Sequence, residues 1–167
     1  MSVTTHSFDL GSHTYQLETG YFANQADGSV LVTVNDCQVF SAVVWDKNFE
    51  STNAFFPLRV DYTDKYYAGG RLPGGFLKRE GKPSEAEVIR SRLIDRSIRP
   101  TFLDHFDQEV QVTCQSFSLD PSIETDVIAL LSSSAALGLT GLPLKTKAAG
   151  GRLGLLNDKV VLKPTRA

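Results

Sequence analysis

The sequence predicts an α+β (mixed α/β) fold, in one domain or a large piece of one. The first observation is a run of segments with strand-type alternation of apolar and polar residues in the first third of the chain. The second is that strand patterns then alternate with helical ones, as in domains whose helices cover a sheet. The third is size, because 167 residues, 41% of them hydrophobic, suffice for one packed core.

Four segments of the first third are predicted strands. Alternation is weak in the earliest segment and clear in the next two, which Asn35-Asp36 joins as a hairpin. The fourth contains Pro57 near its start, where a missing backbone donor is tolerated. We expect these strands at residues 13–18, 29–34, 37–45 and 55–62.

A helix is predicted to begin at Glu85. Ser84 is a suitable N-cap, and Glu87, three residues later, completes a capping box. Apolar residues then recur at helical spacing and are expected to face the core. These residues are Ile89, Leu93 and Ile94.

A strand, a second helix and a hairpin are predicted in the rest of the chain. Residues 109–119 alternate as a half-buried strand does. The helix at residues 125–139 is rich in Ala and Ser, which permits close packing on a sheet, and its serines Ser132 to Ser134 are interpreted as small packing residues. The hairpin strands are expected at residues 152–156 and 159–162, around a turn at Asn157-Asp158.

The two cysteines lie far apart in separate strand patterns. Cys37 and Cys114 are therefore interpreted as buried, reduced thiols and not as a disulfide. Residues 1–13 have neither the basic nor the apolar region of a signal peptide. No apolar run approaches the roughly 20 residues that a membrane-crossing helix needs. We therefore expect a cytoplasmic protein with no membrane partner.

Positive charge is concentrated between Lys65 and Pro100. This stretch contains nine Lys or Arg and four Asp or Glu, a local charge of +5, whereas the whole chain carries −2. Such a local excess favours a polyanionic partner.

Two groups of residues in this stretch are candidate nucleic-acid contacts. In a glycine-framed loop, an aromatic and an apolar residue adjoin two cations. Bases stack on aromatic rings while phosphates bind Lys and Arg, so this pattern suits a single-stranded nucleic acid. The other group is a stripe of helix arginines at i, i+4 and i+7, for which a solvated face with ion pairs to Asp95 is the alternative. The candidates are Phe76, Leu77, Lys78, Arg79, Arg92, Arg96 and Arg99.

Long motifs follow one another in order along nearly the whole chain. They begin with LETGYFANQADGSVLVTV, continue through FFPLRVDYTDKYYAGGRLPGGFLKREGKPSE, SRLIDRSIRP and SSSAALGLTGLPL, and end with VVLKPT. In these motifs the chain closely resembles the first ribonuclease-PH-like core domain of bacterial polynucleotide phosphorylases. The resemblance implies a ribonuclease-PH-like core of ribosomal protein S5 domain 2-like β-α-β architecture. It also implies a truncated domain, with residues 1–167 as the N-terminal portion of the first core domain.

The same resemblance implies the RNA-binding and scaffold part of a phosphorolytic 3′-to-5′ exoribonuclease. Such an enzyme degrades mRNA to nucleoside diphosphates with inorganic phosphate as co-substrate. The family implies Mg²⁺ bound outside this segment, a homotrimer that binds single-stranded RNA, and partners in an RNA degradation complex. Residues 76–79 match the loop at the channel entrance, where many relatives have Phe-Phe-Arg-Arg. Leu77 removes one stacking surface and Lys78 lacks the planar fork of Arg.

No catalytic or metal-binding residue is expected in this chain. Residues 69–75 do not match a phosphate-binding P-loop, and the three histidines lack metal-ligand spacing. By the resemblance, active domains carry a Gly-Thr-Arg-type phosphate motif before the second helix, whereas residues 121–126 lack the arginine. Asp120 and Asp126 are interpreted as a turn carboxylate and a helix-entry charge.

Two hypotheses of function remain. The favoured one is the RNA-holding part of the exoribonuclease, and the alternative is a stand-alone RNA-binding or assembly module without catalysis. The sequence that follows Ala167 in the gene would distinguish them, because a second core domain with its carboxylates is expected for the enzyme.

Overall fold

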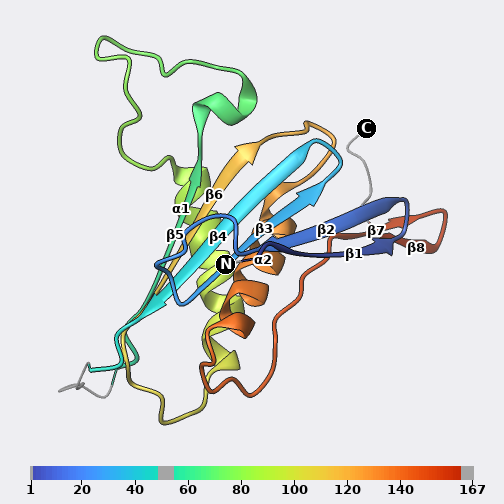
Figure 1. Ribbon diagram of the computed structural model, residues 1–167. Helices are drawn as coiled ribbons and strands as arrows, with labels where there is room; N and C mark the ends of the chain where they lie inside the picture. Colours follow the sequence, from blue (N-terminus) through green and yellow to red (C-terminus); the bar gives the residue numbers. More distant parts are fainter. Residues whose placement is uncertain (1, 49–54, 163–167) are drawn as a thin grey trace.

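A six-stranded sheet runs through the described part of the chain, residues 2–48 and 55–162 of this computed structural model (Figure 1). Its strands are β1 (Thr4–Leu10), β2 (His13–Thr19), β3 (Gly28–Val34), β4 (Cys37–Trp45), β5 (Leu58–Asp64) and β6 (Val110–Ser118). They lie in the order β1-β2-β3-β4-β6-β5. Neighbouring strands are antiparallel except β5 and β6, which are parallel and therefore need the long connection between them.

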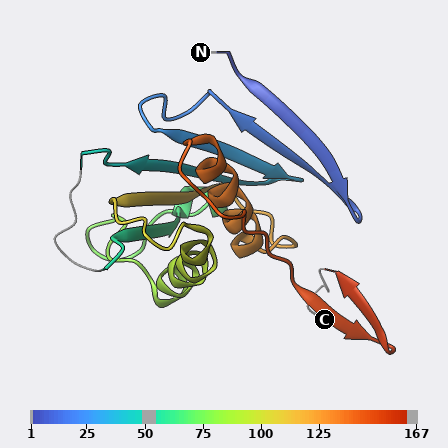
Figure 2. The ribbon, with the colours of Figure 1, turned by 90° about the horizontal axis from the view of Figure 1, so that it is seen from below.

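The helices pack against one face of this sheet. Helix α2 (Thr125–Leu139) lies over β3, β4 and β6, and α1 (Glu85–Ile98) lies over β5 (Figure 2). Two 3-10 turns, η1 (Tyr66–Gly69) and η2 (Arg99–Thr101), lie between β5 and β6 on either side of α1. The layer between helices and sheet forms the core, which confirms the α+β prediction. Its largest fully buried side chains include Tyr15, Tyr62, Ile94, Ile98, Ile128 and Leu137.

Buried serines join α2 to the sheet. The Ser132 hydroxyl donates to the carbonyl oxygens of Val30 (3.1 Å) and Val39 (3.4 Å), on two adjacent strands. Ser133 donates to the Ala129 carbonyl one turn earlier, at 2.6 Å. Small side chains let the helix approach the strands closely, and their hydroxyls are satisfied by backbone acceptors. Ser132, Ser133 and Ser134 are all buried, so their interpretation as packing residues is confirmed.

The strand predictions are largely confirmed. Residues 35 and 36 join β3 to β4, and Asn35 has the positive φ (52°) that such a short connection requires. Cys37 and Cys114 are both buried, as predicted. The fourth strand begins at Leu58, so its predicted start at residue 55 is wrong. The Phe56 carbonyl accepts instead from the Leu58 N–H (3.0 Å), a turn contact, while residues 49–54 lie outside the described part.

Strand β1 was not predicted from the sequence. Its residues, TTHSFDL, pair along their whole length with β2 but are all exposed. An edge strand with a partner on one side and no cover from a helix has no buried face to impose clear alternation. The pairing with β2 therefore defines this strand.

Helix α1 buries a different stripe from the predicted one. Ile94 is fully buried (0%), as expected, but Ile89 and Leu93 are 66% and 48% exposed. The prediction for these two residues is wrong because α1 lies mainly on β5, an edge strand, and so presents a narrow stripe to the core. That stripe passes through Glu87, Ile94 and Ile98.

The predicted capping box at the start of α1 is present and extends to the sheet. Glu87 Oε2 accepts from the Ser84 N–H (2.6 Å) and hydroxyl (2.8 Å), and the Ser84 Oγ accepts from the Glu87 N–H. Glu87 Oε1 accepts from the N–H of Asp64, the last residue of β5, at 2.8 Å. Because both carboxylate oxygens are engaged, one side chain fixes the helix start against the strand end.

Replacing Glu87 by Gln should destabilise the fold in a pH-dependent manner. Burial alone would raise the pKa of Glu87, but the donors from Ser84 and Asp64 hold that pKa below its ordinary value. A group of this kind stabilises the fold above its unfolded pKa and loses that contribution as pH falls through the folded pKa. We expect Glu87→Gln to lower the free energy of unfolding by about 1–2 kcal/mol at pH 7.

Urea denaturation at several pH values measures this effect. The difference between Glu87→Gln and the parent should shrink below roughly pH 4.3, where glutamate becomes protonated in the unfolded chain. Glu85→Gln, which changes an exposed acid of the same helical turn, is the matched control. A difference of equal size at pH 3 and pH 7 would contradict the prediction.

The C-terminal hairpin is also confirmed, as β7 (Leu153–Leu156) and β8 (Lys159–Leu162). Asn157 and Asp158 both have positive φ (49° and 60°), the backbone that a two-residue hairpin turn needs. The hairpin extends away from the main sheet, and Leu155 and Leu156 are exposed (Figure 2). Among the described helices, none combines the length and apolar character that crossing a bilayer demands.

Candidate nucleic-acid interface

The loop between η1 and α1, residues 70–84, carries the first group of candidate residues. It projects from the body of the domain, beyond the end of the sheet (Figure 1). Phe76 is 99% exposed and Leu77 is 75% exposed, and Lys78 and Arg79 are exposed beside them. Lys78 has φ of 50°, an uncommon conformation for a residue with a side chain. The structure thus presents one aromatic ring and two cations together to solvent.

This arrangement is chemically suited to a flexible polyanion with flat bases. A solvent-exposed phenyl ring is a surface on which any base can stack, and adjacent ammonium and guanidinium groups bind phosphate oxygens. A ring that stays exposed after folding contributes no burial energy to the fold, so a binding role explains its position better than packing does.

The helix arginines fall into two kinds. Arg92 and Arg96 are exposed on α1. Arg99 is half-buried, and its guanidinium donates to both Asp95 carboxylate oxygens (2.7 Å each) and to the carbonyl oxygens of Phe56 (2.9 Å) and Leu58 (3.1 Å). The predicted pairing of Asp95 is confirmed for Arg99. Arg99 therefore fixes the segment before β5 to the end of α1, and its donors are occupied within the chain.

The loop and the exposed arginines lie on different parts of the protein. The loop joins α1 at its N-terminal end, whereas Arg92 and Arg96 are about 10 and 16 Å further along the helix axis. Arg92 lines a groove of about 720 Å³ beside β5 that also includes Pro83 and Asp95. A single strand must therefore extend along α1 to reach both groups.

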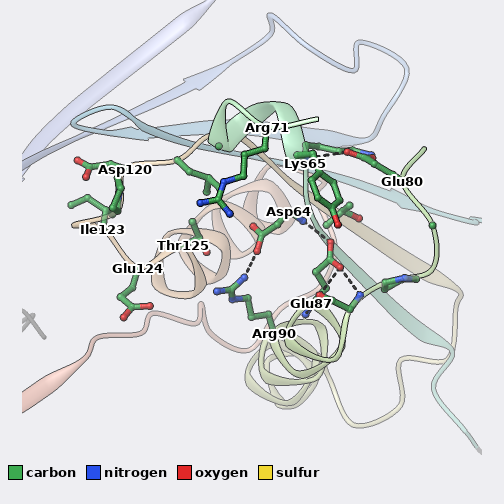
Figure 3. A pocket seen from close by; sticks show the side chains of 18 of the residues that line it. Asp64, Lys65, Arg71, Glu80, Glu87, Arg90, Asp120, Ile123, Glu124 and Thr125 are labelled. Carbon is green, nitrogen blue, oxygen red and sulfur yellow. Dashed lines mark hydrogen bonds and ion pairs between the residues drawn. The ribbon is translucent and has the colours of Figure 1, made fainter. Parts of the chain in front are cut away.

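A cavity of about 870 Å³ lies at the base of the loop, between the end of β5, η1 and the first residues of both helices (Figure 3). Its charges are largely compensated within the chain. Lys65 pairs with Glu80 at 2.8 Å, and Arg90 pairs with Asp64, which also accepts from the Tyr62 hydroxyl. Burial and this hydrogen bond to Asp64 raise the pKa of Tyr62, so its phenol stays protonated.

The start of α2 receives an arginine from a distant segment. Residues 121–126 lack one, but the Arg152 guanidinium, from just before β7, pairs with Glu124 and with Asp126 (3.0 Å). Two carboxylates thus neutralise the cation. Sequence reasoning missed Arg152 because more than 25 residues separate it from these partners and no local pattern signals the contact.

The two aspartates near this helix have the predicted local roles. Asp120 accepts from the Ser122 hydroxyl (2.7 Å) and N–H (2.8 Å), which closes a turn and lowers the pKa of Asp120. Asp126 lies in the first turn of α2, where a negative charge is favourable. Within residues 2–48 and 55–162, no group of three or more His, Cys, Asp or Glu side chains is arranged to hold a metal ion.

Comparison with known proteins gives a family for the chain. Residues 11–143 match the ribonuclease PH family described as "3′ exoribonuclease family, domain 1". Over 165 residues the chain is 48% identical to the polyribonucleotide nucleotidyltransferase of Ruthia magnifica subsp. Calyptogena magnifica. That alignment covers 99% of this chain and 24% of the relative, so the chain spans about a quarter of the relative's length.

Solved structures share the fold at low sequence identity. Rice (Oryza sativa) Rrp46 matches with a TM-score of 0.69 and 19% identity, over 90% of this chain and 66% of that one. A structure described as the Archaeoglobus fulgidus exosome with RNA bound to the active site matches with a TM-score of 0.65 and 19% identity, over 99% of this chain and 66% of that one. The fold is therefore ribonuclease PH-like. From this fold and the match over residues 11–143, the chain belongs to the 3′ exoribonuclease family, with a polyribonucleotide nucleotidyltransferase among its relatives.

Proposed function

We propose that this chain is the RNA-holding part of a polyribonucleotide nucleotidyltransferase, which degrades mRNA from its 3′ end to nucleoside diphosphates. The observation that carries the proposal is the exposed Phe76 ring beside Lys78 and Arg79 in a projecting loop. The 48% identity to a polyribonucleotide nucleotidyltransferase also supports the proposal. The reaction as a whole is proposed for a longer polypeptide, since the chain spans a quarter of that relative.

In this proposal the loop grips single-stranded RNA without reading its sequence. Phe76 stacks on a base, and Leu77 provides apolar contact beside it. Lys78 and Arg79 bind the phosphates on either side, which sets most of the affinity. Arg92 and Arg96 contact the strand further along α1. Arg99 is outside the proposed contact set because its guanidinium is already bonded to Asp95 and to two carbonyl oxygens.

We place the phosphorolytic chemistry outside this chain. Attack of inorganic phosphate on the RNA requires a cationic phosphate site and, in this family, Mg²⁺ to stabilise charge on the transferred phosphoryl group. The described residues do not fit a magnesium site, since they offer no suitable carboxylate cluster. Arg152 lies at the start of α2, but its guanidinium is paired with Glu124 and Asp126. No step of the reaction is therefore assigned to residues of this chain.

We also propose a homotrimer, partners in an RNA degradation complex, and a cytoplasmic location. The resemblance of the fold to a structure described as an exosome with bound RNA supports assembly. Exposed apolar side chains on α1 and on β7, such as Ile89, Leu93 and Leu155, supply area that an assembly can cover.

The 167-residue chain alone should release no nucleoside diphosphates from poly(A) in the presence of inorganic phosphate and Mg²⁺. The physical reason is that the described residues supply neither an unpaired phosphate-binding arginine at α2 nor a metal-binding cluster. Thin-layer chromatography of labelled poly(A) measures the release, and the same chain should still bind fluorescent oligoadenylate. Phosphate-dependent release by a homogeneous preparation would overturn the placement of catalysis outside the chain. The RNA-holding role would be overturned if the chain did not bind oligoadenylate, or if substitutions in the loop left that binding unchanged.

A further inference from the structure

The loop that carries residues 76–79 is attached to the domain through the carboxylate of Glu80. Before this part of the loop, the Arg71 N–H donates to the Tyr66 carbonyl at 3.0 Å. From Leu72 to Arg79, within the described structure, the chain forms no hydrogen bond or ion pair with any other segment. Glu80 is then the next point of attachment, directly after the two cations (Figure 3).

Both oxygens of the Glu80 carboxylate are used in this attachment. Oε2 accepts from Lys65 Nζ at 2.8 Å, and Oε1 accepts from the Tyr66 N–H at 3.1 Å. Charge-assisted and bidentate contacts of this kind restrict a side chain more than a single neutral hydrogen bond does. The hydrogen bond from Lys65, followed by that from Tyr66, holds the pKa of Glu80 below its ordinary value, so the carboxylate is ionised at neutral pH.

The partners of Glu80 are connected to the main sheet. Lys65 follows directly after β5, and its N–H donates at 3.1 Å to the hydroxyl of Ser116, a fully buried residue of β6. The attachment therefore runs from two adjacent strands of the sheet to the residue after Arg79. Successive Cα atoms are 3.8 Å apart, so fixing Glu80 confines the backbone of Arg79 and Lys78 to a small region.

We propose that Glu80 is a positioning residue for RNA, whose carboxylate holds Lys78 and Arg79 where phosphates can meet them. This inference rests on the proposed function of the loop. Its energetic basis is that a pre-ordered loop loses less conformational freedom when it binds than a free one.

The proposal predicts that removing Glu80 changes RNA affinity in the direction opposite to the one that charge alone predicts. An acid beside two phosphate-binding cations repels RNA, so removing an acid that has no positioning role should strengthen binding. Removing Glu80 also frees the Lys65 ammonium, which would add to that attraction. If Glu80 positions the loop, its removal should weaken binding in spite of the more favourable charge.

Fluorescence anisotropy at about 0.1 M salt distinguishes an acid that positions the loop from one that does not. It measures the binding of fluorescent oligoadenylate to the 167-residue chain. We expect Glu80→Ala to weaken binding about threefold to tenfold. Glu80→Gln should have a smaller effect, because its carbonyl oxygen still accepts from the Tyr66 N–H. Glu85→Ala is the matched control: it removes an exposed acid five residues away, and its affinity should equal or exceed that of the parent. If the Glu80→Ala variant binds oligoadenylate as tightly as the Glu85→Ala variant does, the proposal is wrong.

Chymotrypsin cleavage after Phe76, without RNA, gives a readout independent of binding. Phe76 lies four residues before Glu80, so the substitution does not alter the residues next to the cleaved bond. Glu80→Ala should speed this cleavage several-fold because the loop opens more often. Unchanged cleavage, or faster cleavage with unchanged affinity, would contradict the proposal. Failure of the proposed function itself would be seen differently, as unchanged RNA affinity in a Lys78→Ala/Arg79→Ala variant.

Discussion

Lys78→Ala/Arg79→Ala should flatten the dependence of RNA affinity on salt. Phosphate contacts release counterions from the RNA, and each contact with a single strand contributes roughly 0.7 to the slope of log K against log salt. The two exposed cations should therefore account for about 1.4 of that slope if each binds one phosphate. The measurement is anisotropy of fluorescent oligoadenylate with the 167-residue chain from 50 to 300 mM salt.

Phe76→Ala should change the same measurement in a different way. Stacking on an aromatic ring contributes about 1–3 kcal/mol per base, so affinity should fall about 5- to 150-fold. The slope should stay nearly constant, because no charge is lost. The decrease should be similar for oligoadenylate, oligouridylate and oligocytidylate, since every base has a face that can stack.

Two further variants complete this pair of results. Arg92→Ala tests the proposed contact along α1: the slope should fall by roughly 0.7 if Arg92 binds a phosphate, whereas affinity and slope should stay at parent values if Arg92 belongs only to a solvated face. Arg99→Lys tests a structural arginine and should lower stability, because its four hydrogen bonds within the chain need the guanidinium fork. If the loop variants leave affinity and slope unchanged, the positive charge of residues 65–100 serves solubility and the RNA site lies elsewhere.

The elements that were predictable from sequence are those whose signal is local. The start of α1 depends on Ser84 and Glu87, three residues apart, and the structure contains the complete capping box. The hairpins at Asn35 and at Asn157-Asp158 depend on short turns with positive φ. The β6 pattern places Val110, Val112 and Cys114 on the buried face, as its alternation predicts.

The features that were not predictable depend on contacts between distant segments. Strand β1 is defined by its partner, and the exposure of Ile89 and Leu93 is defined by where α1 crosses the sheet. A helix pattern shows which residues are apolar but not how wide the covered stripe is. Arg152 reaches α2 across more than 25 residues, and no spacing rule connects them.

In the candidate interface, too, local features were predictable from the sequence and contacts between distant segments were not. The sequence of residues 76–79 shows an aromatic residue and cations side by side, and the structure adds their exposure. The sequence gives no sign that Arg99 is occupied by Asp95 and two carbonyl oxygens while Arg92 and Arg96 are free to contact solvent, since all three share one helical stripe. Nor does it indicate that Glu80, an acid in a basic loop, bonds to Lys65.

Helix α2 passes very close to β3 at Gly28, and Gly28→Ala should destabilise the fold strongly. A Cβ at this first residue of β3 would lie 2.3 Å from the Ala136 carbonyl oxygen and 2.9 Å from Thr140 Cγ2. The first of these is backbone of α2 and cannot rotate away, so the helix must shift from the sheet. Overpacking of this kind costs about 1–3 kcal/mol, occasionally more, and we expect the upper end.

Thermal unfolding followed by circular dichroism tests this expectation against a matched variant. At about 2–4 °C per kcal/mol for a domain of this size, Gly28→Ala should lower Tm by about 6–12 °C. Gly74→Ala makes the same chemical change where a Cβ meets nothing within 4 Å, so it should leave Tm nearly unchanged. Equal Tm values for the two variants would show that α2 is farther from β3 than the structure places it. In that case the buried serine contacts from Ser132 to Val30 and Val39, which need the same close approach, would also be in question.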